Sequence, residues 1–139
     1  MRVSTTGGAP VALSSAKAAW LPSISSDGQQ VGFSSATADG KGVFLVVPAG
    51  GGAPLHQVNL PPDSDLATLS RDGSGLTYVL HMGDVDNLWY QSFAGGAPKQ
   101  LTHFPTDHIY AYSFSRDGKK VAITRGNSKQ DAVMLSNFR

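Results

Sequence analysis

Short runs of alternating apolar and polar residues dominate this sequence, and most of them end at turn-forming residues. The clearest pair is YAYSFS (110–115) and KVAIT (120–124), which flank the charged break RDGK. Alternation with period two places successive side chains on opposite faces of a strand. No window of ten or more residues keeps an apolar face at helical spacing without meeting Gly or Pro. The pattern therefore predicts an all-β fold with little or no helix.

The alternating runs repeat along the chain. The tetrapeptide GGAP begins at positions 7, 51 and 95, which are 44 residues apart. Turns that contain Asp-Gly recur 45 residues apart, as Asp27-Gly28, Asp72-Gly73 and Asp117-Gly118. Apolar residues keep their distance from these turns, as in Ile24, Leu69 and Phe114, in Val31, Leu76 and Val121, and in Phe33, Tyr78 and Ile123. A shared register of this kind indicates an internal structural repeat.

Each repeat contains four predicted strands. In the last copies these are 110–115, 120–124, 132–137 and, after GGAP, KQLT at 99–102. A period near 44 with four strands per unit is typical of a β-propeller blade, whereas a β-sandwich would not need its turns to repeat in register. We predict one partial propeller domain over 1–139 with about three blades. Its units span roughly 15–58, 59–102 and 103–139, and 1–14 completes a neighbouring blade.

The repeat resembles that of the TolB-like β-propellers, which are related to the WD repeats. The matching motifs are the turns SSDG, SRDG and SRDG, the segments GVFLV, NLWYQ and AVMLS, and GGAP with KQLT. The resemblance covers essentially the whole chain, although the Gly-His and Trp-Asp dipeptides of ordinary WD repeats are absent. The chain also departs from the family pattern, because Ser26, Arg71 and Arg116 stand where Pro is frequent. In LHQV, Gln57 replaces the leucine seen at positions 13 and 101.

The resemblance implies the C-terminal three blades of a larger bacterial propeller with six or more blades. The chain begins with RVSTT, which looks like the tail of a third strand, followed by VALS, which looks like an outer strand. It ends on a third strand. An open stack exposes strand edges and an apolar face, which natural proteins pair or cover. We expect either that a missing N-terminal half closes the ring or that two copies do so. In the homodimer, VALS of one chain would lie beside 132–137 of the other.

Composition narrows the range of partners. Eleven Lys and Arg against ten Asp and Glu give a net charge of +1, and the longest basic run is the pair Lys119 and Lys120, so nucleic acid is not expected. The absence of cysteine excludes disulfides and thiolate metal sites. The longest apolar run, 43–47, is too short to insert into a membrane, and no signal peptide is recognisable. The compartment stays open between bacterial periplasm and cytoplasm.

Carboxylates and histidines are the candidates for site chemistry. We interpret Asp27, Asp72 and Asp117 with their glycines as structural turns rather than cation ligands. Asp84 and Asp86 in GDVDNLW are a second cation candidate, which we interpret as a solvated loop. The four histidines, at 56, 81, 103 and 108, form no His-x-x-x-His pair and do not recur in register.

The best candidate for a ligand or partner surface is the group His103, Asp107 and His108, which flank and include the loop segment FPTD. Trp89 and Tyr112 are interpreted as core between blades rather than as a ligand platform. No Gly-x-Ser-x-Gly elbow or phosphate-binding glycine loop is present, so we predict no catalytic residue, cofactor or metal.

Together these features favour a non-catalytic propeller module for protein interaction or sensing, with another copy of itself or another protein or peptide as the partner. The alternative from the enzyme class is a fragment of the gating propeller of a prolyl-oligopeptidase-like serine peptidase, inactive alone. A third possibility is a purely structural assembly unit.

Overall fold

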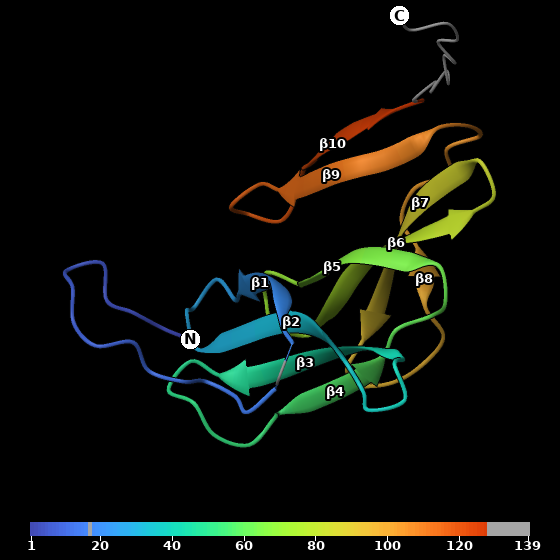
Figure 1. Ribbon diagram of the computed structural model, residues 1–139. Coiled ribbons are helices and arrows are strands. Elements are labelled where there is room, and N and C mark those ends of the chain that lie inside the picture. Colours follow the sequence, from blue (N-terminus) through green and yellow to red (C-terminus); the bar gives the residue numbers. More distant parts are fainter. Residues whose placement is uncertain (17, 128–139) are drawn as a thin grey trace, which may run out of the picture.

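The computed structural model describes residues 1–16 and 18–127, and this part of the chain folds into ten strands without a helix (Figure 1). The all-β prediction is confirmed. The strands are β1 (Trp20–Ile24), β2 (Gln30–Ala36), β3 (Gly42–Pro48), β4 (His56–Asn59), β5 (Ser64–Leu69), β6 (Gly75–Met82), β7 (Val85–Ser92), β8 (Lys99–Gln100), β9 (His108–Phe114) and β10 (Val121–Gly126).

The strands form three antiparallel sheets in chain order. Two of them have four strands, β1-β2-β3-β4 and β5-β6-β7-β8, and the third is the pair β9-β10. They follow one another as stacked layers (Figure 1). The prediction of a partial propeller built of four-stranded antiparallel blades is confirmed. We refer to the three sheets as the first, second and third blade. The strand predicted at 132–137 lies outside the described residues.

The predicted strand at 99–102 is wrong in length, because β8 ends at Gln100. The hydroxyl of Thr102 accepts the N–H of Leu88 at 2.9 Å, so a side chain takes the role of the next ladder carbonyl. The segment LHQV does form an outer strand, since β4 pairs with β3 and places Gln57 opposite Leu45. At the N-terminus, Arg2 and Val11 form a single antiparallel bridge.

The three Asp-Gly turns share one hydrogen-bonding pattern and connect the first two strands of each blade. Their glycines, Gly28, Gly73 and Gly118, have φ values of 72°, 73° and 69°, which only glycine adopts freely. Each aspartate accepts a serine hydroxyl and the N–H two residues ahead, as Asp117 does from Ser115 at 2.6 Å and Lys119 at 3.1 Å. Both hydrogen bonds lower the pKa of Asp27, Asp72 and Asp117, and the one from the serine hydroxyl has the larger effect. These bonds account for the turn aspartates without a ligand.

The lowered pKa values of the turn aspartates predict that the protein loses stability in acid. Because folding lowers the pKa of these carboxyls, their contribution is complete above the ordinary Asp pKa of about 4 and is lost as pH falls through the lowered values. Replacing all three aspartates by Asn keeps an acceptor in each turn but removes the titration. We expect the urea midpoint of the variant to fall less steeply between about pH 5 and 3.

Asp84→Asn, in the exposed β6–β7 loop, removes a charge of the same sign and serves as the control. An unchanged slope in the triple variant would show that these turns do not cause the acid sensitivity.

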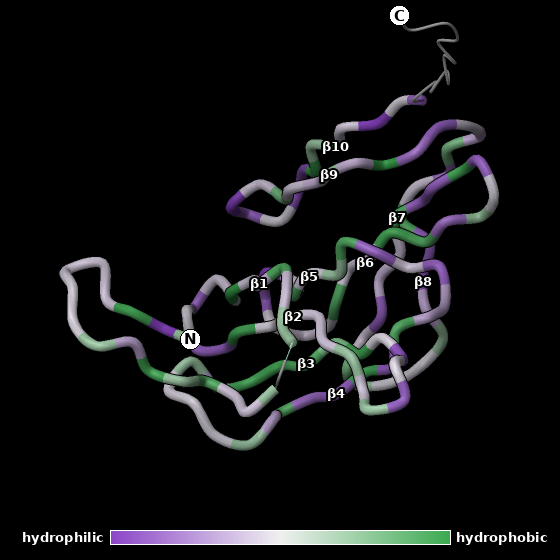
Figure 2. The backbone as a smooth tube through the Cα atoms, in the orientation of Figure 1, coloured by the Kyte–Doolittle hydropathy of each residue, from purple (hydrophilic) through white to green (hydrophobic). Residues whose placement is uncertain are grey.

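The core lies between the sheets. Phe44 and Val46 of β3 pack against Leu69, Leu76 and Tyr78 of the second blade, and Trp89 lies at the edge of this cluster. On the other face of the second blade, Val79 and Leu88 meet Ile109, with Leu66, Phe104, Tyr112 and Ile123 around them. Apolar residues follow β3 and β6 in the hydropathy view (Figure 2). Burial between the blades is therefore what joins the repeats.

Tyr112 couples the third blade to the second through its ring and its hydroxyl. The hydroxyl lies 2.9 Å from the Thr68 hydroxyl and 2.8 Å from the carbonyl oxygens of both Leu66 and Thr77. Burial raises the pKa of this phenol well above its ordinary value, so the group stays protonated and can donate. This is the environment of a core residue between blades.

Candidate functional site

Of the three residues predicted as a surface site, Asp107 and His108 line the same surface hollow and His103 does not. His103 is exposed in the segment between β8 and β9, whereas Asp107 and His108 are half-buried. The Asp107 carboxylate lies 3.3 Å from the Arg125 guanidinium and accepts a hydrogen bond from the Asn127 amide. His108 instead directs Nδ1 toward Asp86. Asp107 and His108 thus line one surface hollow but have different hydrogen-bond partners.

A cluster of His81, Asp86 and His108 forms where the second and third blades meet. His81 lies near the end of β6, directly opposite Asp86 of β7 in the antiparallel ladder, and His108 is the first residue of β9. Nδ1 of His81 lies 2.7 Å from Oδ1 of Asp86, and Nδ1 of His108 lies 3.3 Å from the same oxygen. We call these three residues the His-Asp-His cluster.

Asp86 is the buried centre of this cluster. Its side chain is 0% exposed, while the two imidazoles are 37% and 36% exposed. Burial raises the pKa of the Asp86 carboxyl, but the Ile109 N–H, at 2.8 Å from Oδ2, and the two imidazoles together outweigh burial and bring the pKa below its ordinary value. Asp86 is therefore a carboxylate at neutral pH. A carboxylate only accepts, so each Nδ1 that bonds to it must carry the proton.

The backbone around the cluster is fixed by the neighbouring residue of β7. Oδ1 of the buried Asn87 accepts the N–H of Phe104 at 2.7 Å and the hydroxyl of Thr102 at 2.9 Å. The Arg125 guanidinium then stacks over the Phe104 ring at 4.0 Å. Asp86 itself donates its N–H to the carbonyl of Asp107 at 3.1 Å. These contacts tie the loop before β9 to β7, so His108 is presented on a constrained backbone.

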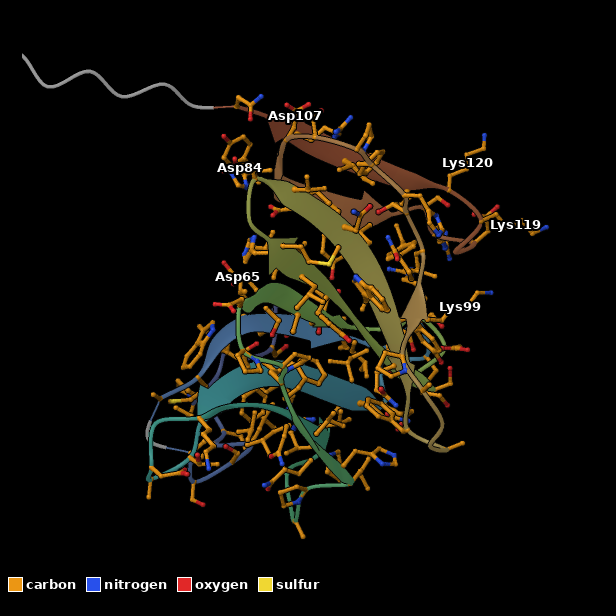
Figure 3. The ribbon with its side chains drawn as sticks, turned by 90° about the vertical axis from the view of Figure 1, so that its right-hand side faces the viewer. Asp65, Asp84, Lys99, Asp107, Lys119 and Lys120 are labelled. Atoms are coloured by element: carbon orange, nitrogen blue, oxygen red, sulfur yellow. The ribbon has the colours of Figure 1, made fainter. Side chains whose placement is uncertain are left out.

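The cluster opens on one rim of the blade stack. A surface hollow of about 400 Å³ lies beside it, lined by His108, Asp84, Asp107 and the loop Pro105–Thr106. Asp84 and Asp107 lie at the same end of the molecule, and Lys119 and Lys120 lie at the opposite rim (Figure 3). The cluster is accessible to small solutes through the exposed edges of its imidazoles.

The sequence interpretation was right about Asp84 and wrong about Asp86. Asp84 is exposed in the β6–β7 turn, whereas Asp86 lies in β7 and is fully buried. The available signal was the polar pair Asp86 and Asn87 at the start of an apolar strand, where a buried charge requires partners. His81 carried no sequence signal, because only the β6–β7 pairing places it opposite Asp86.

Comparison with known proteins supports the fold. No protein-family model matches the sequence, and no curated protein sequence matches it. Among solved structures, TolB from Acinetobacter baumannii aligns with 74% of this chain at a TM-score of 0.53 and 22% sequence identity. The chain has the TolB propeller fold. It spans 25% of the length of that TolB chain.

The TolB likeness confirms the resemblance drawn from the repeats at the level of fold. Within this TolB-like architecture, the His-Asp-His cluster occupies the junction of the second and third blades. No helix among the described residues has both the length and the apolar character needed to cross a membrane.

Proposed function

We propose that this chain is a non-catalytic β-propeller module that binds another protein or a peptide through its loops, and that a second copy completes its blade stack into a ring. The TolB-like fold supports the propeller part of this proposal. Propellers present loops on a rigid scaffold, which suits recognition. The observation that carries the assembly is a face of the first blade that residues 1–16 and 18–127 leave largely uncovered.

Equivalent repeat positions differ in exposure between the first and second blades. Leu69 of the second blade is 5% exposed because the first blade covers it, whereas its repeat equivalent Ile24 is 56% exposed. Trp20 on β1 is also exposed, at 43%. A hollow of about 350 Å³ lies along this face, between Trp20 and Phe33. Apolar surface of this kind marks an interaction site.

The N-terminal segment already occupies part of this face. Leu13 is buried against Phe33 and Val47, much as Val58 of the outer strand β4 packs onto the core between the first and second blades. The segment around Leu13 thus lies where the outer strand of a preceding blade would lie. The repeat makes the remaining surface complementary to a further blade of the same kind, which a second copy supplies by ordinary two-fold closure.

The molar mass of the full, untagged chain in solution tests this proposal. Light scattering at micromolar concentration is expected to give twice the 14.5 kDa of one chain. Ile24→Lys should shift the protein to the monomer with an unchanged β-sheet circular dichroism spectrum, since it places a charge on the uncovered face. Leu55→Lys, at an exposed position on the β3–β4 connection, should stay dimeric.

A monomeric wild-type mass would contradict the homodimer and favour further blades within a longer chain as the cover. Turnover of peptide substrates by the purified chain would overturn the non-catalytic assignment.

A further inference from the structure

Two imidazoles and a carboxylate converge in the His-Asp-His cluster from three strands of two blades. The ligand atoms of His81, Asp86 and His108 all lie within 4.8 Å of one another. Both Nδ1 atoms face the same carboxylate oxygen, at 2.7 Å and 3.3 Å. Histidines 27 residues apart in sequence do not meet at one carboxylate through local structure, so the blade junction itself builds the cluster.

We propose that this cluster binds a divalent transition-metal ion of the Zn²⁺ type. Zn²⁺ takes imidazole nitrogen and carboxylate oxygen at about 2.0–2.2 Å, which places neighbouring ligand atoms of a tetrahedral site about 3.3 Å apart. The separation of 3.3 Å between His108 and Asp86 equals that edge, and the separation of 2.7 Å between His81 and Asp86 is about 0.6 Å shorter. All three ligand atoms lie within 4.8 Å of one another, so small side-chain shifts would bring them to the edge length. Two imidazoles with one carboxylate also favour Zn²⁺, Co²⁺ or Ni²⁺ over Mg²⁺ and Ca²⁺, which prefer oxygen ligands.

Backbone groups around the cluster orient its ligands, as hydrogen-bonding partners of the ligands do in known metal sites. The Ile109 N–H binds Oδ2 of Asp86 and leaves Oδ1 directed at the two histidines. The Asp86 N–H holds the Asp107 carbonyl and so fixes the residue before His108. Ligand orientation of this kind contributes to metal affinity. The partly exposed imidazoles leave one side of the ion open to water or to an external ligand.

Binding would exchange one network for another. Without the ion, each Nδ1–H donates to Oδ1 of Asp86; with it, each Nδ1 gives its lone pair to the metal and the ring proton resides on Nε2. The ion would then link β6 and β7 of the second blade to β9 of the third. The metal site does not depend on dimerisation, because all three ligands come from one chain.

Titration of the full, untagged chain with Co²⁺ and Zn²⁺ tests the site. We expect one Co²⁺ per chain with visible d–d absorption, displacement of Co²⁺ by Zn²⁺, and no effect of Mg²⁺ or Ca²⁺. His81→Ala and His108→Ala should each weaken binding more than tenfold, since even outer-shell changes cost 10–100-fold. The double variant His56→Ala/His103→Ala removes the chain's other two histidines and should bind as the wild type does.

Thermal unfolding provides a second measurement that does not depend on a spectrum. At a Zn²⁺ concentration about a hundredfold above Kd, Tm of the wild type should rise by several degrees. Tm of His81→Ala and of His108→Ala should not change. Circular dichroism of the cluster variants without metal checks that they fold. Loss of binding in the His56→Ala/His103→Ala variant, or binding by the wild type no tighter than by His81→Ala, would overturn the proposal and leave the cluster as a hydrogen-bonded brace.

Discussion

Replacing Phe44 by alanine is expected to lower the free energy of unfolding by about 3–5 kcal/mol. The Phe44 side chain is fully buried at the centre of the cluster between the first and second blades. Truncation removes its transfer free energy and leaves a cavity that two ladder-bound sheets cannot close by local shifts. Since domains of this size have about 5–15 kcal/mol of stability, this loss is a large fraction of the total.

Urea unfolding followed by intrinsic fluorescence measures this effect. Leu55→Ala is the control, because Leu55 is 49% exposed and its truncation should change stability by less than about 0.5 kcal/mol. A Phe44→Ala loss no larger than that of Leu55→Ala would mean that the two blades do not pack as described.

Introducing a methyl group at Gly75 should destabilise the second blade by about 1–3 kcal/mol or more. A Cβ at this position would overlap the carbonyl oxygen of Gln91 and lie 2.6 Å from the Tyr90 ring. The ring is held in place by a hydrogen bond of 2.9 Å between the Tyr90 and Ser74 hydroxyls. Both neighbours belong to the β6–β7 pair, so relief requires the ladder itself to shift.

Thermal unfolding of Gly75→Ala beside Gly50→Ala tests this expectation, because a Cβ at Gly50 meets no atom within 4 Å. Adding Tyr90→Ala to Gly75→Ala should not restore stability, since the backbone oxygen of Gln91 remains in the way. Equal stability of the two glycine variants would contradict the close approach.

Much of the fold could be predicted because it depends on residues close together in sequence. Period-two alternation defines strands locally, and Asp27-Gly28, with its two counterparts, defines the hairpins through serine and backbone hydrogen bonds within a few residues. The regular spacing then indicated blades, and the motifs indicated the TolB-like type. The error at β8 had a local cause, because the hydroxyl of Thr102 replaced a backbone acceptor.

The candidate site was far less predictable. The sequence indicates His108 and Asp86 as candidates in two separate groups, and His81 belongs to neither. Their distances along the chain say nothing about contact, which depends on the register of β6 with β7 and on the docking of β9. The requirement for glycine at Gly75 is of the same kind, since its repeat equivalents are Gln30 and Lys120.

The sequence by itself therefore determined the strands, the turns and the repeat, because these follow from short-range steric and hydrogen-bonding preferences. Only the tertiary structure decided which polar side chains meet. Burial between blades brings distant strands together, and a buried carboxylate such as Asp86 must then find its partners among whatever groups the neighbouring blade presents.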